Sequence, residues 1–181
     1  PRSSSAASDV YKRQIQVPGI GLSGVVPALD FLTASNRKSL GDDVAEFDSG
    51  VLNAGNKNVV VIGGGDTAMD CVRTAIRQNA KSVTCLYRRD KVNMPGSQRE
   101  VQNAEEEGVN FQWLSAPHAL LGDGSVQAVR ARRIHLGQPD ETGRQVPRII
   151  ENSDFDVDAE LVIKALGFDP CLLYTSPSPR D

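Results

Sequence analysis

The sequence predicts an α/β fold organised around a Rossmann-like, nicotinamide-binding domain. A buried strand, a glycine turn and a helix follow one another without a break. The strand at 59–62 consists of four apolar residues and suits a position covered on both faces of a sheet. Gly63, Gly65 and Ala68 then have the G-x-G-x-x-G/A spacing of a dinucleotide-binding turn. The unpaired amides at the start of the helix would hold the pyrophosphate.

The residues after the glycine turn complete a strand–helix–strand unit. The apolar residues recur at helical spacing and predict one buried face, made of Ala68, Cys71, Val72, Ala75 and Ile76. Asn79 suits the left-handed position just past the helix. A second strand is expected at 82–87, so the unit closes within about thirty residues, as the fingerprint requires.

The end of the second strand indicates which dinucleotide is preferred. An NAD site usually has an acidic residue here to bind the ribose 2′-hydroxyl, but this chain has Arg88 and Arg89. Paired guanidiniums can hold the 2′-phosphate of NADPH through charge-assisted hydrogen bonds. We therefore predict an NADPH site formed by Gly63, Gly64, Gly65, Asp66, Thr67, Ala68, Arg88, Arg89 and Lys91.

The segment before the first strand is expected to be a connection and a loop. A turn-rich lead precedes a short helix at 27–34, and its apolar residues Leu29, Phe31 and Leu32 are expected to be exposed toward a neighbouring domain. The polar residues 42–57 predict a surface loop.

Beyond the arginine pair the sequence predicts the remaining elements of a three-layer domain. A capping box of Ser97 and Glu100 is expected to start a helix, followed by a third parallel strand at 110–114. Turns at 122–124 and 140–143 then separate extended segments, which predicts an antiparallel β-meander attached to the parallel sheet. A final strand is expected at 159–166.

Composition excludes several classes of function. The formal net charge of −3 gives no basic surface for nucleic acid, and no apolar run is long enough to span a membrane. Cys71 and Cys85 have neither C-x-x-C nor metal-ligand spacing, so we expect reduced core thiols and a cytoplasmic protein. His118 and His135 lack partner motifs. We therefore predict no catalytic acid–base residue and no metal site.

Both ends of the chain are expected to lie outside the natural protein. Residues 1–14 and 171–181 match translated adapter oligonucleotides of a sequencing library, and they are excluded from the prediction of the fold. The natural part is then a fragment, 15–170.

Several motifs in order resemble the small chain of NADPH-dependent glutamate synthase. They are VVVIGGGDTAMD at 59–70, LYRRD at 86–90, MPGS at 94–97, EEEG at 105–108 and LVIKALGF at 161–168. The resemblance implies that an NADPH domain, 58–166, is inserted into a truncated FAD domain. Residues 15–57 would then be the connection from the FAD domain, and 167–170 the return to it.

The resemblance also implies a reaction and a partner. In this family, hydride passes from NADPH to FAD, and electrons then cross iron–sulfur clusters to a large subunit that forms glutamate from glutamine and 2-oxoglutarate. The FAD and iron–sulfur sites of such a parent would lie outside 15–170, so this chain would retain one nucleotide site and be inactive alone.

Two alternatives remain open at this point. The chain could belong to a paralogous flavin and iron–sulfur oxidoreductase that delivers electrons to another acceptor, such as a pyrimidine or a ferredoxin. It could also be a module that binds NADPH without turnover. The lack of C-x-x-C argues against an enzyme of the thioredoxin reductase type.

Overall fold

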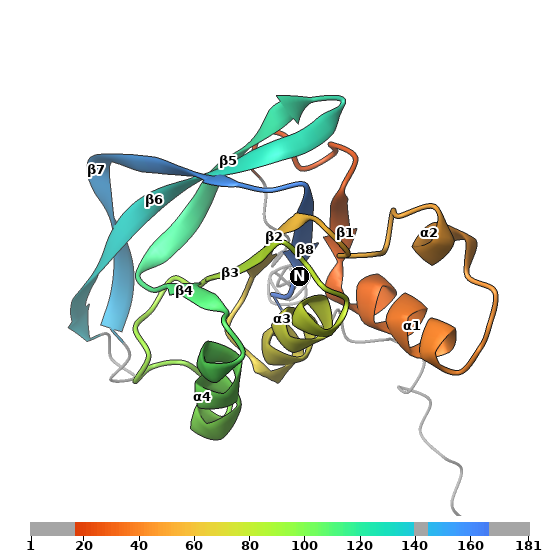
Figure 1. The fold of residues 1–181 in the computed structure, drawn as a ribbon. Helices are drawn as coiled ribbons and strands as arrows, with labels where there is room; N and C mark the ends of the chain where they lie inside the picture. Colours follow the sequence, from red (N-terminus) through yellow and green to blue (C-terminus); the bar gives the residue numbers. More distant parts are fainter. Residues whose placement is uncertain (1–16, 140–144, 167–181) are drawn as a thin grey trace, which may run out of the picture.

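The computed structural model describes residues 17–139 and 145–166 (Figure 1). The predicted ends of the chain, 1–14, 167–170 and 171–181, lie outside the described residues, and so does the turn expected at 140–143. The described residues form three layers, with a parallel sheet between helices and a second, antiparallel sheet. This arrangement confirms the predicted α/β class.

The central sheet contains five parallel strands in the order β1-β8-β2-β3-β4. Their bounds are Val25–Pro27 for β1, Asn58–Ile62 for β2, Ser82–Leu86 for β3, Asn110–Gln112 for β4 and Leu161–Lys164 for β8. The last strand in sequence therefore lies in the interior of the sheet, between β1 and β2. The strands expected after the helices are confirmed, whereas β1 was not predicted.

Strand β2 shows why the sheet is covered on both faces. Val59 and Val61 pack into the core under the helices, while Val60 and Ile62 pack into the core under the second sheet. Successive side chains of a strand point to opposite faces, so a run of apolar residues can serve two cores. All four side chains are at most 2% exposed.

The helices lie on one face of this sheet (Figure 1). They are α1 (Ala28–Ser39), α2 (Ala45–Asp48), α3 (Asp66–Arg77) and α4 (Gln98–Glu106). The predicted stripe of α3 is confirmed, because Ala68, Cys71, Val72 and Ala75 are buried. Asn79 has a φ of 59°, in the left-handed region that its sequence position predicted.

Helix α1 and the segment after it differ from the prediction. The helix continues to Ser39, because polar residues on its solvent side and Arg37 and Lys38 in its last turn are compatible with a helix C-terminus. Phe31 is fully buried, so the expectation that it is exposed was wrong, while Leu29 is 55% exposed. The expected loop at 42–57 contains α2, and Val44 beside it is buried.

The predicted capping box of α4 is wrong. Ser97 is the N-cap residue, but its side chain caps no amide. Its own amide donates instead to Asp66 Oδ1 at 3.1 Å, and Glu100 forms an ion pair with Arg73 of α3. Partners from another helix have replaced the local contacts that the sequence pattern suggested.

The second sheet is the predicted antiparallel meander. It contains β5 (Ser115–Asp123), β6 (Ser125–Pro139) and β7 (Gln145–Asp158) in sequential order. The turn between β5 and β6 requires Gly124, whose φ is +72°. The meander covers the face of the parallel sheet opposite the helices.

Two observations concern only the helices and side chains that the structure describes. None of the described helices is long and apolar enough to cross a membrane. Within the described ranges, no group of three or more His, Cys, Asp or Glu side chains is placed to hold a metal ion. His118 and His135 are both exposed on the meander.

Cys71 and Cys85 are buried core residues, as predicted. Burial raises the pKa of each thiol to about 12. We expect neither thiol to react with a disulfide reagent at pH 8 in the folded chain, because the reactive thiolate is scarce and enclosed. The measurement is a thiol titration of a Cys171→Ser variant, with and without denaturant. Two equivalents released without denaturant would contradict the burial.

Candidate dinucleotide-binding site

The glycine turn lies at the carboxyl end of β2, and its three glycines have different surroundings. A Cβ on Gly63 would lie 2.2 Å from Ala165 O, and the φ of this residue is +151°. A Cβ on Gly64 would lie 2.3 Å from the ring of Tyr87. At Gly65 the same atom would meet nothing within 4 Å. The first two glycines are thus required by the protein's own packing, while the third borders open space.

The backbone amides of this turn are suited to an anion. Gly65 is the N-cap of α3, with no side chain capping the helix. Among the described residues, the amides of Gly64, Gly65, Asp66 and Thr67 have no hydrogen-bond acceptor. Unpaired amides and the positive end of a twelve-residue helix favour a negatively charged group. The turn therefore fits a pyrophosphate.

Ala68 is fully buried, so its side chain packs α3 against the sheet and does not line the open turn. This is the packing role that the third position of the fingerprint has. Asp66 and Thr67 form the first turn of α3, but the Asp66 carboxylate accepts a hydrogen bond from the Ser97 amide.

The arginine pair lies next to the glycine turn. Ile62 and Leu86 are paired in register in β2 and β3, and the Gly63 amide donates to Leu86 O at 3.2 Å. Arg88 and Arg89 follow two and three positions after Leu86, at the same sheet edge. Neither guanidinium has an ion-pair partner among the described residues. Two unpaired positive charges thus lie beside a row of unpaired amides.

Lys91, the other predicted cation, is engaged within the protein. Its ammonium lies 2.6 Å from Glu105 Oε2 of α4. Lys91 therefore differs from Arg88 and Arg89, which have no ion-pair partner among the described residues, although all three belong to one stretch of sequence.

An aromatic cluster that the sequence reasoning missed lines the same edge. The Tyr87 ring lies against Gly64, and its edge faces Trp113 at a centroid distance of 6.4 Å. Trp113 stacks on Phe111 at 4.8 Å. A signal was present, because Tyr87 immediately precedes the arginines and the third strand contains alternating aromatic residues.

Residues 90–97, which we call the strap, connect the arginine pair to α4 and lie against the glycine turn. The Gly96 amide donates to Gly64 O at 3.1 Å, and the Tyr87 hydroxyl donates to Asn93 O at 3.2 Å. Met94 is buried in the core under the helices. The strap is therefore held on both the turn and the core.

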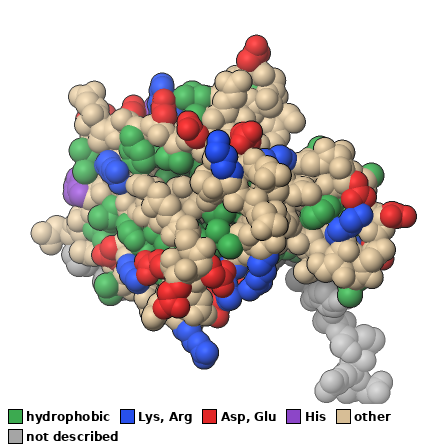
Figure 2. All heavy atoms as spheres, viewed as in Figure 1, with side chains coloured by type: hydrophobic (Ala, Val, Ile, Leu, Met, Phe, Trp, Pro, Cys, Tyr) green, Lys and Arg blue, Asp and Glu red, His purple; other side chains and the backbone are tan. Residues whose placement is uncertain are grey.

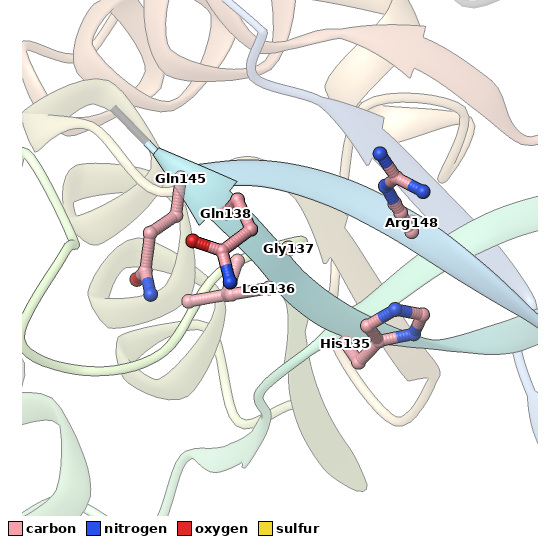
Figure 3. Close-up of a pocket in the computed structure, with 6 residues that line it drawn as sticks. All are labelled: His135, Leu136, Gly137, Gln138, Gln145 and Arg148. Atoms are coloured by element: carbon pink, nitrogen blue, oxygen red, sulfur yellow. The ribbon is translucent and has the colours of Figure 1, made fainter. Parts of the chain in front are cut away.

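A separate hollow lies on the meander (Figure 3). It has a volume of about 450 Å³ and is lined by His135, Leu136, Gly137, Gln138, Gln145 and Arg148. All of these residues belong to β6 and β7, and none was a predicted site residue. Figure 2 shows acidic and basic side chains interspersed over one face of the molecule.

Comparison with known proteins gives relatives that are much longer than this chain. The small chain of glutamate synthase [NADPH] from Azospirillum brasilense is 65% identical over 165 residues, which cover 91% of this chain and 34% of that protein. The NADPH-Fe(3+) oxidoreductase subunit beta of Geobacter sulfurreducens is 45% identical over 120 residues, which cover 65% of this chain and 18% of that protein. The chain thus spans about a third or less of these two relatives.

Structure and family patterns agree on the fold. FprA of Mycobacterium tuberculosis in complex with NADPH superimposes with a TM-score of 0.68 at 16% identity, over 86% of this chain and 47% of that one. At this identity the likeness concerns the fold alone. The sequence pattern of one family matches residues 12–174, which is most of the chain. The chain belongs to the pyridine nucleotide-disulphide oxidoreductase family.

Proposed function

We propose that this chain is the NADPH-binding part of a glutamate synthase small chain, which passes hydride from NADPH to FAD. One observation carries the proposal: unpaired amides at the end of β2 lie beside the unpaired guanidiniums at the end of β3. Adjacent strands are about 4.8 Å apart, so the two sites can bind two phosphate groups of one nucleotide. The 65% identity to the Azospirillum small chain indicates the kind of enzyme.

The protein's part in this reaction is to bind and orient. The amides from Gly64 to Thr67 would hold the pyrophosphate, and Arg88 and Arg89 would hold the 2′-phosphate. The nicotinamide supplies the hydride when NADPH is bound. In this proposal no side chain of the site has to accept or donate a proton.

The other components of the reaction would lie outside this chain. We propose that FAD and the iron–sulfur clusters are held by other parts of the longer protein, and that electrons pass to the large subunit of glutamate synthase. A cytoplasmic location fits the two described cysteines, which are free thiols.

A second candidate is an oxidoreductase with another electron acceptor. It is favoured by the 45% identity to a subunit of the Geobacter NADPH-Fe(3+) oxidoreductase. The same NADPH site would serve both enzymes, since the acceptor is reached only after the flavin. Reduction assays on the longer protein, with glutamine and 2-oxoglutarate or with Fe(3+), would separate the two candidates. A module that binds NADPH without turnover would reduce neither acceptor.

We predict that the purified chain is colourless, binds NADPH weakly and does not oxidise it with artificial electron acceptors. The reason is that the glycine turn that binds FAD is proposed to lie in another part of the longer protein, so no flavin would accept the hydride in this chain. The measurements are an absorbance spectrum, a titration followed by fluorescence of Trp113, the only tryptophan, and an oxidation assay. The longer protein is the positive control. Stoichiometric flavin or steady oxidation would contradict the assignment.

A further inference from the structure

We propose that Asp66 is a positioning residue for cofactor specificity: its carboxylate fixes the strap to the glycine turn and so holds Arg88 and Arg89 in place for the 2′-phosphate. The inference rests on the function proposed above and adds a residue that acts through the strap. It starts from the contact between Asp66 Oδ1 and the Ser97 amide, 3.1 Å long.

The surroundings of Asp66 favour this role over direct contact with the cofactor. An ionised carboxylate repels a pyrophosphate, so it is unsuited as a ligand in the anion site. Here the carboxylate accepts a hydrogen bond from the Ser97 amide at the start of α4. The positive end of this helix favours a negative charge. Asp66 is also the first residue of α3, so it joins the beginnings of two helices.

Besides the buried Met94 and the ion pair of Lys91 with Glu105, three hydrogen bonds attach the strap to the glycine turn, to Tyr87 and to α3. Two involve groups that also pack the protein, namely the Gly96 amide with Gly64 O and the Tyr87 hydroxyl with Asn93 O. The third is made by Asp66, whose side chain is exposed and supports no core. The Asp66 side chain can therefore be truncated to alanine without creating a cavity.

The strap begins immediately after the arginine pair. A well-ordered strap therefore keeps Arg88 and Arg89 in position for the 2′-phosphate, which distinguishes NADPH from NADH. Arg89 is also held at the backbone, where its carbonyl accepts from the Leu114 amide at 3.0 Å. Its guanidinium, like that of Arg88, is held by no ion pair in the described part of the chain. Loss of the Asp66 contact would loosen the strap, and NADPH would then have to order it again on binding, which costs conformational entropy. NADH has no 2′-phosphate and is not affected in this way.

The readout is the ratio of NADPH affinity to NADH affinity, measured on the chain by quenching of Trp113 fluorescence. We expect Asp66→Ala to lower this ratio by about three- to tenfold, the effect of losing one charge-assisted hydrogen bond that acts indirectly. Asp66→Asn keeps an acceptor oxygen and should retain most of the ratio. Loss of the Asp66 charge also changes the electrostatic repulsion of the pyrophosphate, but this effect is the same for NADPH and NADH. It therefore cancels in the ratio of the two affinities.

Ser97→Pro removes the donor of the same hydrogen bond. The φ of Ser97 is −57°, which proline adopts without strain, and its amide donates only to Asp66 among the described residues. We expect the same fall in the ratio as for Asp66→Ala. The double variant should show no further fall, since both changes break one contact. If Ser97→Pro does not fold, the comparison of Asp66→Ala with Asp66→Asn decides.

Failure of this inference can be distinguished from failure of the proposed function. Wild-type chain that binds NADPH no better than NADH would overturn the proposed function. A wild-type preference for NADPH that Asp66→Ala leaves unchanged would overturn only the role of Asp66. Equal losses in Asp66→Ala and Asp66→Asn, or additive losses in the double variant, would also show that the Ser97 contact does not set the ratio.

Discussion

Gly65→Val is expected to abolish dinucleotide binding in a chain that still folds. The new side chain would meet no protein atom within 4 Å of its Cβ, because the space beside Gly65 is open. The φ of Gly65 is −93° and its ψ is 179°, an extended conformation that valine adopts readily. The same open space is where a pyrophosphate must approach the amides of the turn. The branched side chain therefore excludes the ligand without disturbing the protein.

The measurement is a titration with NADPH together with a denaturant unfolding curve. We expect no detectable binding and a loss of about 1 kcal/mol or less in the free energy of unfolding, since an N-cap glycine is replaced. Gly64→Ala is the matched control, because its Cβ would lie 2.3 Å from the Tyr87 ring and should destabilise the fold. Undiminished binding by folded Gly65→Val would place the nucleotide elsewhere.

Replacing both Arg88 and Arg89 by alanine should weaken NADPH binding far more than NADH binding. Each charge-assisted contact to the 2′-phosphate is worth roughly 1.5–3 kcal/mol, or about ten- to hundredfold in affinity. Neither guanidinium is tied up in an ion pair within the described residues, so both are available to the ligand. Parallel titrations with the two nucleotides measure the difference.

Arg37→Ala is a suitable control for the loss of positive charge. Arg37 lies in the last turn of α1, the helix that follows the edge strand β1, and it forms an ion pair with Asp42 at 3.0 Å. We expect both affinities to stay as in the wild type. An equal loss of NADPH and NADH binding in the double arginine variant would show that the pair does not recognise the 2′-phosphate.

The parts of the fold that sequence predicted depend on contacts between near neighbours. The strand at 58–62, the glycine turn and the stripe of α3 each follow from a pattern within a few residues. Strand β1 was missed because it has only three residues and pairs with β8, more than a hundred residues later. A short apolar segment gives no periodicity from which such pairing can be inferred.

In the candidate site, too, the features predicted from sequence are local ones, and those that were missed depend on contacts between distant segments. The amides of the glycine turn and the arginine pair were predicted from spacing, and the structure brings them together at one sheet edge. The partner of Asp66 was not predicted, because the contact depends on where the strap returns to α3. The capping box failed for the same reason: Glu100 pairs with Arg73, which a local motif does not include.

The interior place of β8 has a consequence for how the chain folds. Val162 of β8 pairs with Val25 on one side and Val60 on the other, so the sheet closes only after almost all of the described chain has been synthesised. Such non-local pairing raises the contact order and slows folding. A nascent chain that ends before Leu161 would leave β1 without a partner strand and one edge of β2 unpaired. Unpaired edges of this kind are templates for aggregation, so a chaperone would be most useful in that interval.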